Sequence, residues 1–199
     1  MKKKILSVLA IMTMLACSLS AQQANPESDF NVARTKDLKG VVILDYIGTS
    51  KTVIIPDQIR GLPVTTIGEK AFQKKNLDNV TIPNTVTEIG DFTFSESGLT
   101  SVTIPNSVIS IGPDAFYDNQ LTSVTIPNSM KFIAAWAFVA DWTDPKNKDN
   151  DNQITSITIG NACGLSNVSF QFGFDAFYQQ VNQRAGTYNY QNGSWQEQW

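Results

Sequence analysis

Apolar and polar positions repeat along the middle of the chain. Residues 77–98 read LDNVTIPNTVTEIGDFTFSESG, residues 99–120 read LTSVTIPNSVISIGPDAFYDNQ, and residues 121–138 read LTSVTIPNSMKFIAAWAF. The same apolar pattern therefore returns every 22 residues. A period between about 20 and 50 residues indicates a solenoid, in which each coil buries its apolar face against its neighbours.

Each repeat predicts one short strand followed by a return path. In the segment 101–105, two apolar side chains alternate with Ser101 and Thr103, which is typical of a strand with one buried face. Pro105 has no amide hydrogen to continue a ladder, so the strand should end there. The apolar residues of Val108–Phe116 recur at uneven spacing, which predicts an irregular return. One strand and one return would make one coil.

Stacked coils would place equivalent residues about 4.8 Å apart and so form ladders of similar side chains. Strand ends are expected at Pro56, Pro83, Pro105 and Pro127, with Gly160 in the last coil. The predicted buried ladders are Val53, Val80, Val102, Val124 and Ile157, and Phe72, Phe94, Phe116 and Phe138. An outward row, favoured by strand propensity and by hydroxyl hydrogen bonding, contains Thr81, Thr103, Thr125 and Thr158. This row is a candidate binding surface, or it reflects strand propensity alone.

The sequence predicts that the chain is divided into four parts. Residues 1–21 combine three lysines, an apolar run and small residues, which indicates a signal peptide rather than a membrane span of about 20 residues. Two processing alternatives stay open, cleavage near Ala21 and lipoprotein processing before Cys17, where MLAC is similar to a bacterial lipobox. A leader and N-terminal cap are expected at 22–40, the repeat solenoid at 41–170, and a C-terminal cap with an aromatic tail at 171–199.

The two caps carry their own signals. The run VVILDYIG at 41–48 predicts an opening strand, and a GLP turn at 61–63 explains five extra residues in the first coil. Aromatic and apolar residues from Phe174 to Val181 recur at helical spacing, and Asn192-Gly193 predicts a hairpin. The expected fold class is an α+β repeat solenoid with one strand per coil and a short C-terminal helical cap.

Charge and cysteine content exclude several classes of function. Without the predicted signal peptide, 12 basic residues face 18 acidic ones, a balance of −6. An acidic chain without a basic stripe is a poor candidate for binding nucleic acid or anionic lipid. Cys163 lies three residues after Gly160, which is a core position of the repeat, and the chain has no histidine to activate a thiol.

The regular spacing breaks in the fourth coil, where an insertion of about 11 residues separates Phe138 from Ile154. Insertions in solenoids project as loops, so Trp142 is a candidate anchor for a partner, or it packs against Trp136. The same insertion contains four residues whose side-chain oxygens could bind calcium: Asp149, Asn150, Asp151 and Asn152. The glycine and the bidentate glutamate of a calcium-binding loop are missing, which favours a solvated loop.

Two rival functions have weaker signals. The C-terminal aromatics could form a sugar-stacking platform, although packing on the cap is favoured: Tyr188, Tyr190, Trp195 and Trp199. A hydrolase that uses two carboxylates would need a pair from these acidic residues: Glu96, Asp114, Asp141 and Asp144. Their spacing brings no two of them together across a cleft. The sequence therefore predicts a binding protein without enzymatic activity, cofactor or metal.

The pattern LxxVTIPxSVxxIGxxAF resembles the BspA-like leucine-rich repeats of bacterial surface proteins. GLPVTTIGEKAF at 61–72 looks like their common first unit, and AGTYNYQNGSW at 185–195 looks like an element that follows such repeats. The resemblance implies a secreted or cell-surface protein, including an outer-membrane lipoprotein if Cys17 is lipidated. It also implies adhesion to extracellular or host proteins, and the family has no shared catalytic residues. The ligand and oligomeric state stay open.

Overall fold

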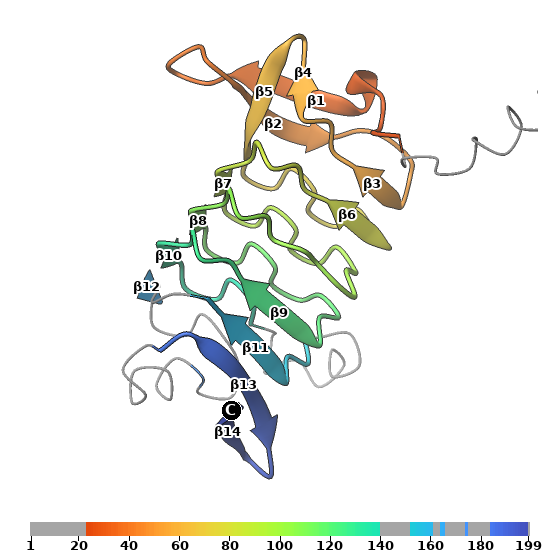
Figure 1. The fold of residues 1–199 in the computed structure, drawn as a ribbon. Helices are drawn as coiled ribbons and strands as arrows, with labels where there is room; N and C mark the ends of the chain where they lie inside the picture. Colours follow the sequence, from red (N-terminus) through yellow and green to blue (C-terminus); the bar gives the residue numbers. More distant parts are fainter. Residues whose placement is uncertain (1–22, 140–151, 161–163, 166–173, 175–183, 199) are drawn as a thin grey trace, which may run out of the picture.

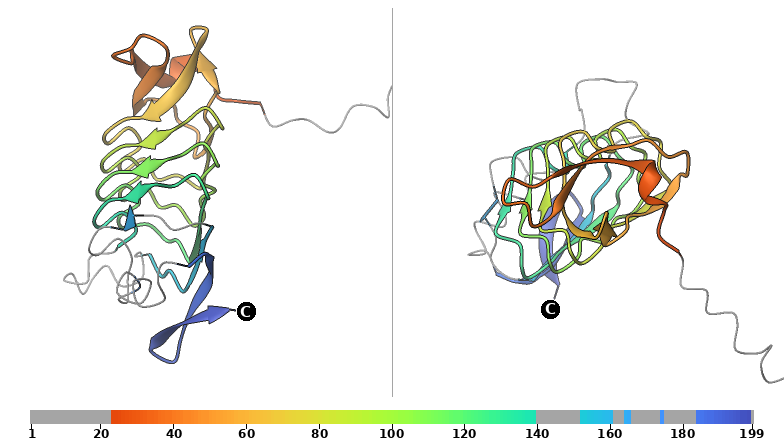
Figure 2. Two further views of the ribbon diagram at one scale, coloured as in Figure 1. Left: turned by 60° about the vertical axis from the view of Figure 1, so that its left-hand side comes forward. Right: turned by 90° about the horizontal axis from the view of Figure 1, so that it is seen from above.

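The structure is a computed structural model that describes residues 23–139, 152–160, 164–165, 174 and 184–198. These residues form a β-solenoid of about four coils, stacked from the N-terminal strands to the C-terminal hairpin (Figure 1). Seen from above, the coils superpose into one elongated ring whose two long sides carry the strands (Figure 2). The predicted solenoid is therefore confirmed.

One long side of the ring is an eight-stranded sheet, here called the return sheet. Its strands follow each other in the order β1-β2-β5-β7-β8-β10-β12, with β4 paired to β5. Their bounds are β1 Phe30–Arg34, β2 Val41–Tyr46, β4 Gln58–Ile59, β5 Leu62–Ile67, β7 Glu88–Ile89, β8 Ser110–Ile111, β10 Phe132–Ile133 and β12 Gly164–Leu165.

The other long side carries the VTIP-type strands. In this group β3 pairs with β6 in parallel, Thr81 bridges Thr103 in the next coil, and a four-stranded sheet has the order β14-β13-β11-β9. The bounds are β3 Thr52–Ile54, β6 Asn79–Thr81, β9 Ser123–Ile126, β11 Ser156–Ile159, β13 Gly186–Gln191 and β14 Ser194–Gln198.

The prediction of one strand per coil is wrong, because the return path contains a second strand. Ile67, Ile89, Ile111 and Ile133 pair in register from coil to coil, and each is fully buried. These strands are only two residues long from β7 onward, so their hydrogen bonds repeat along the stack rather than along the chain. A two-residue strand leaves no alternating pattern in the sequence, which explains why the return was predicted as irregular.

The predicted phenylalanine ladder is confirmed and forms the centre of the core. Rings of Phe72, Phe94, Phe116 and Phe138 stack with centroids 5.0–5.3 Å apart and interplanar angles of 5–23°. Tyr46 extends the ladder by one ring, 5.3 Å from Phe72. Each of these four phenylalanines is fully buried, so the ladder removes a continuous apolar column from water.

The α+β class is not supported, because in the part of the chain that the structure describes helix is confined to the 3-10 turn η1 at Glu27–Asp29 and to Phe174. The predicted C-terminal helical cap is not supported. Phe177, Tyr178 and Val181 of that segment lie outside the described residues. The predicted hairpin is confirmed, since β13 and β14 pair across Asn192-Gly193, which have φ values of 51° and 82°.

The N-terminal end of the stack is built from antiparallel strands. The predicted opening strand is β2, and β1 pairs with it in antiparallel register. The GLP turn is a second hairpin, in which β4 and β5 pair across Arg60 and Gly61 with φ values of 54° and 72°. These strands cover the first coil, whose open edge would otherwise leave strand groups without partners.

Candidate binding surface

The predicted threonine row is brought together on the outer side of the VTIP-type strands. Thr81 pairs with Thr103, and Thr125 pairs with Thr158. The row continues beyond the repeats, because Thr158 pairs with Thr187 of β13 and their hydroxyl oxygens lie 3.0 Å apart. A parallel row contains Ser123, Ser156, Asn189 and Gln196.

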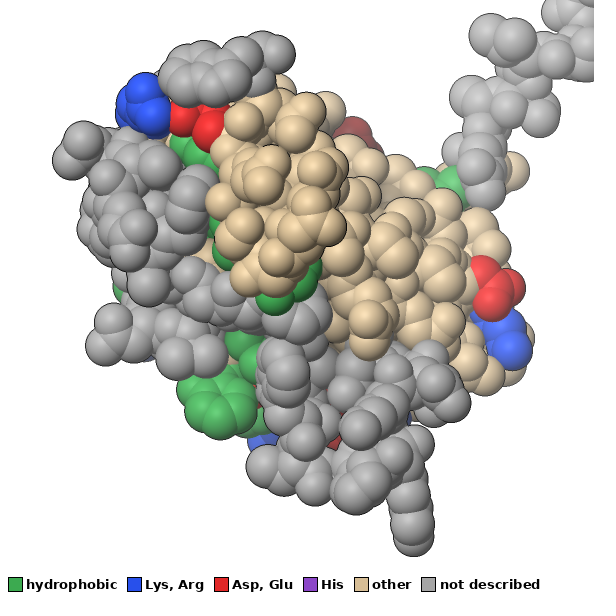
Figure 3. Space-filling model, turned by 90° about the horizontal axis from the view of Figure 1, so that it is seen from below, with side chains coloured by type: hydrophobic (Ala, Val, Ile, Leu, Met, Phe, Trp, Pro, Cys, Tyr) green, Lys and Arg blue, Asp and Glu red, His purple; other side chains and the backbone are tan. Residues whose placement is uncertain are grey.

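The outward side chains of β3, β6, residues 101–103, β9, β11, β13 and β14 are here called the threonine face. They alternate with buried residues, as the pattern exposed-buried-exposed-buried in β9 shows. Apart from Ile54 they are uncharged polar residues: Thr52, Asn79, Thr81, Ser101, Thr103, Ser123, Thr125, Ser156, Thr158, Thr187, Asn189, Gln191, Ser194, Gln196 and Gln198. In the view from below, the described surface is mostly uncharged, with acidic and basic side chains at its margins (Figure 3).

The size of the threonine face limits what it can bind by itself. Six strand spacings of about 4.8 Å give a length of about 29 Å, and four residues of about 3.3 Å give a width of about 13 Å. The resulting area of about 400 Å² is half of the about 800 Å² that one partner buries in a standard interface. A protein that binds this face must also contact its margins, or bind weakly.

Thr187, Asn189, Gln196 and Gln198 were not predicted as part of this surface. Their alternation with Tyr188, Tyr190 and Trp195 is visible in the sequence, and it correctly indicated a hairpin. What the sequence lacked was the register that joins this hairpin to the last repeat strand. That register depends on the antiparallel pairing of β13 with β11.

Several predicted residues lie outside the described part of the chain: Cys17 and the signal peptide at 1–21, Asp141, Trp142 and Asp144, Asp149, Asn150 and Asp151, Cys163, and Trp199. Their predicted roles stay predictions, as do the boundaries of the four parts. Within the described ranges, no helix has the length and apolar character that crossing a membrane requires.

Asn152 has a structural role, which contradicts the favoured prediction of a solvated loop at this residue as well as the weaker one of a calcium ligand. It is buried, its Oδ1 accepts a hydrogen bond from the Leu121 amide at 3.0 Å, and its Nδ2 donates to the carbonyls of Phe116 and Phe138 at 2.7 and 3.2 Å. The oxygen that a cation would need is therefore occupied. In the described part of the chain, no group of three or more acidic, cysteine or histidine side chains could hold a metal ion.

Two of the four C-terminal aromatics are packed in the core instead of forming a sugar platform. Tyr188 is fully buried and Trp195 is 6% exposed. Both rings meet Phe174 edge-on, with centroids 5.5 and 4.8 Å away, and Tyr190 lies 5.4 Å from Trp195. The favoured prediction, packing within the C-terminal region, is confirmed for these residues.

The described carboxylates of the rival hydrolase are in different surroundings. Glu96 forms an ion pair with Lys74 at 3.1 Å. Burial raises the pKa of Asp114, and the negative charge of the neighbouring Asp91 raises it further. The pKa of Asp114 therefore depends on Asp91 of the adjacent coil, which was not among the predicted candidates.

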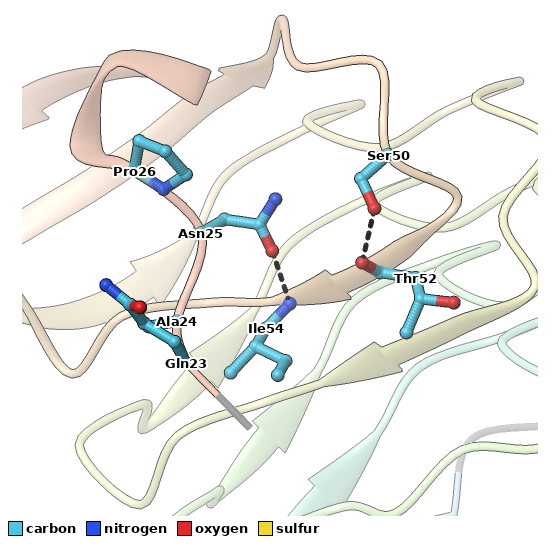
Figure 4. Close-up of a pocket in the computed structure, with 7 residues that line it drawn as sticks. All are labelled: Gln23, Ala24, Asn25, Pro26, Ser50, Thr52 and Ile54. Carbon is cyan, nitrogen blue, oxygen red and sulfur yellow. Dashed lines mark hydrogen bonds between the residues drawn. The ribbon is translucent and has the colours of Figure 1, made fainter. Parts of the chain in front are cut away.

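An open pocket of about 510 Å³ lies beside β3 at the N-terminal edge of the threonine face (Figure 4). The Asn25 side-chain oxygen accepts a hydrogen bond from the Ile54 amide at 2.8 Å, and the Ile54 carbonyl accepts one from the Asn25 amide at 2.9 Å. The Ser50 hydroxyl donates to the Thr52 carbonyl at 2.6 Å. These contacts satisfy backbone groups at the edge of β3, so Asn25 and Ser50 cap the sheet there.

The fold defines a repeat protein whose described VTIP-type strands present an extended polar outer face. The model of the BspA type leucine rich repeat region, in six copies, matches residues 65–185. The chain therefore belongs to the BspA-type leucine-rich repeat family, which confirms the resemblance. Leucine-rich repeats are generally binding modules rather than enzymes.

One solved structure shares the repeat fold, and two others are similar over part of the chain. A leucine-rich repeat protein from Bacteroides capillosus is 26% identical, with a TM-score of 0.52 over 66% of this chain and 94% of that one. The T. pallidum leucine-rich repeat protein is 29% identical, with a TM-score of 0.49 over 58% of this chain and 66% of that one.

A leucine-rich cell surface protein from Faecalibacterium prausnitzii is 23% identical, with a TM-score of 0.46 over 72% of this chain. The chain spans 43% of that protein and slightly less than two thirds of the T. pallidum protein. Comparison with curated protein sequences gives no match.

Proposed function

We propose that this chain is a secreted or surface-attached adhesin that binds an extracellular or host protein through the threonine face. The observation that carries the proposal is the continuity of the face across the repeats and the C-terminal hairpin, where outward residues from β3 to β14 are polar and uncharged apart from Ile54. Such a face offers hydroxyl and amide groups at a regular spacing.

The physical character of the face predicts how the partner binds. Since the face is uncharged, its affinity for a partner should depend little on ionic strength. Since the area of the face is small, the affinity should be about micromolar, unless the partner also contacts the margins. Membership in the BspA-type family supports a binding role, and the predicted signal peptide supports export.

A binding screen tests the proposal. The chain is offered by interferometry to extracellular matrix proteins, mucins and a glycan panel, each at low and moderate salt. We expect saturable binding to at least one protein that persists at moderate salt. Binding to glycans alone, or to no protein in the panel, would contradict adhesion to proteins.

A further inference from the structure

One corner of the coil stack carries a column of residues with left-handed backbone. Lys70, Phe92, Asp114 and Trp136 have φ values of 59°, 53°, 55° and 66°. Each follows the buried isoleucine of a return-sheet strand by three residues, at the same place in successive coils. We call these four residues the corner column.

Backbone hydrogen bonds hold the corner column in register. The Lys70 amide donates to the Asp91 carbonyl at 3.0 Å, and the Phe92 amide donates to the Pro113 carbonyl at 2.9 Å. The Asp114 amide donates to the Ala135 carbonyl at 3.3 Å. Each member is thus joined to the next coil, so the four side chains are stacked about 4.8 Å apart.

The N-terminal half of the corner column already holds a cation. The Lys70 ammonium lies 5.5 Å from the centre of the Phe92 ring, a distance at which the negative face of the ring attracts it. The same ammonium is 2.7 Å from the Glu69 carboxylate. An aromatic ring and a carboxylate therefore act together on one positive charge of this chain.

The C-terminal half offers the same chemistry without a cation. Trp136 is 49% exposed. The Asp114 carboxylate forms no hydrogen bond or ion pair with any residue in the described ranges. The Asp91 Oδ1, from the preceding coil, lies beside Gly112, two residues before Asp114, where it would clash with an added Cβ. The charge of Asp91 acts on the Asp114 carboxylate from there. Two neighbouring carboxylates and an exposed indole are the groups that favour a positive ligand.

We propose that Asp91, Asp114 and Trp136 form a site for the guanidinium group of an arginine side chain of a protein partner. A guanidinium is planar, so it can stack on the indole while its N–H groups donate to the carboxylates. A neutral sugar could stack on Trp136, but it would leave the repulsion between the two carboxylates uncompensated. The acidic balance of the chain also attracts a basic partner.

This inference concerns a different surface from the proposed function, because the corner column follows the return sheet on the other long side of the coils (Figure 2). Either surface can bind a ligand when the other does not. Variants of the corner column leave the threonine face unchanged, so the two proposals can fail separately.

Calorimetry of the full chain with two peptides tests the site. Hexa-arginine is the probe, and hexa-citrulline is the control because it keeps the shape of the side chain without its charge. We expect hexa-arginine to bind and hexa-citrulline not to bind. Asp114→Asn and Trp136→Ala should each weaken the affinity about fivefold or more, and added salt should weaken the binding of the unaltered chain.

Two matched variants distinguish a site from general attraction to an acidic chain. Phe132→Ala removes an aromatic ring of almost the same exposure, 48%, outside the corner column. Asp78→Asn removes an exposed carboxylate elsewhere. Both should bind hexa-arginine within about twofold of the unaltered chain. Thermal unfolding shows whether each variant is folded, and Trp136→Leu replaces Trp136→Ala if the alanine variant is not.

Three results would overturn the site. Hexa-citrulline could bind as tightly as hexa-arginine, which would exclude recognition of the charge. Hexa-arginine could bind Asp114→Asn and Trp136→Ala as tightly as the unaltered chain. Finally, the matched variants could weaken the binding equally, which would leave only attraction by the net charge.

Discussion

Asn119 and Asn152 occupy the same position in successive coils although 33 residues separate them. The Asn119 Oδ1 accepts from the Leu99 amide at 3.0 Å, and its Nδ2 donates to the carbonyls of Phe94 and Phe116 at 2.8 and 3.0 Å. Asn152 repeats this arrangement one coil further on, and both side chains are buried. The insertion of the fourth coil is therefore confined to the segment before Asn152.

Replacing Asn119 by alanine should destabilise the fold by about 2 to 4 kcal/mol. The substitution leaves the Leu99 amide and the Phe94 carbonyl without the partner that they have in the buried interior, and each unsatisfied group costs about 1 to 3 kcal/mol. Urea unfolding measures the change, with Gln120→Ala as the exposed neighbouring control. Equal stability of both variants would contradict a structural role for the buried amide.

The phenylalanine ladder should be most sensitive at its centre. Phe94 stacks on Phe72 and Phe116 at 5.0 and 5.3 Å and is fully buried. We expect Phe94→Ala to lower the free energy of unfolding by about 3 to 5 kcal/mol, because it leaves a cavity between the two rings. Phe94→Leu should cost about 1.5 kcal/mol. Denaturant titration compares the two, and a loss below about 1 kcal/mol for alanine would show that the ladder contributes little.

Asn25 should protect the backbone amide of Ile54, at the edge of β3, from hydrogen exchange. Its side chain accepts a hydrogen bond from the Ile54 amide, and alanine cannot. Loss of one such bond at the edge should cost about 1 kcal/mol and should speed hydrogen exchange of the Ile54 amide. Exchange measured by NMR checks this, with the buried Ile89 amide as the internal control. Unchanged exchange at Ile54 would mean that Asn25 does not cap the strand.

At neutral pH, the Asp114→Asn variant should be more stable than the unaltered protein. The pKa of Asp114 is raised by burial and by Asp91, so between its unfolded and folded pKa values the folded state binds more protons and stability falls as the pH rises. Asp114→Asn removes this loss, by about 0.5 kcal/mol or less because the side chain is only partly buried and solvent screens its charge.

The pH dependence separates this effect from the preference of asparagine for left-handed backbone, which does not change with pH. Thermal unfolding of Asp114→Asn and the unaltered chain is compared from neutral pH to below about 4. The advantage of asparagine should shrink as the pH falls. An advantage that grew on acidification would contradict the raised pKa. If hexa-arginine binding is also lost, the carboxylate serves binding at the expense of stability.

The sequence predicted the parts of the fold that repeat with side-chain identity. Phe94 and Phe116, or Thr81 and Thr103, are equal residues at a fixed spacing, so their stacking follows from the period. Asn119 could also have been aligned with Asn152, since each precedes the first apolar residue of a strand unit by two positions. Asn152 was instead predicted to lie in a solvated loop, with calcium as the weaker alternative, because the segment was interpreted by composition rather than by register.

The remaining features depend on the backbone and not on residue type. Phe92, Asp114 and Trp136 share one left-handed conformation but have unrelated side chains, so no pattern in the sequence connects them. The two-residue strands of the return sheet are formed by pairing between coils, for which a single repeat carries no signal. The sequence therefore predicts which side chains stack, while the structure is needed to show which residues share the left-handed corner of the coil.

The most direct test of the account compares two double variants in binding to the protein found by the interferometry screen. Thr81→Lys with Thr125→Lys places two charged side chains on the threonine face. Thr87→Lys with Ser110→Lys places one directly before β7 and one in β8, at the return sheet. Binding through the threonine face predicts about tenfold weaker affinity or more for the first variant, because lysines introduce bulk and a desolvation cost. The second variant should bind within about twofold of the unaltered chain. Unchanged affinity for the first variant, with loss for the second, would contradict the threonine face as the binding surface.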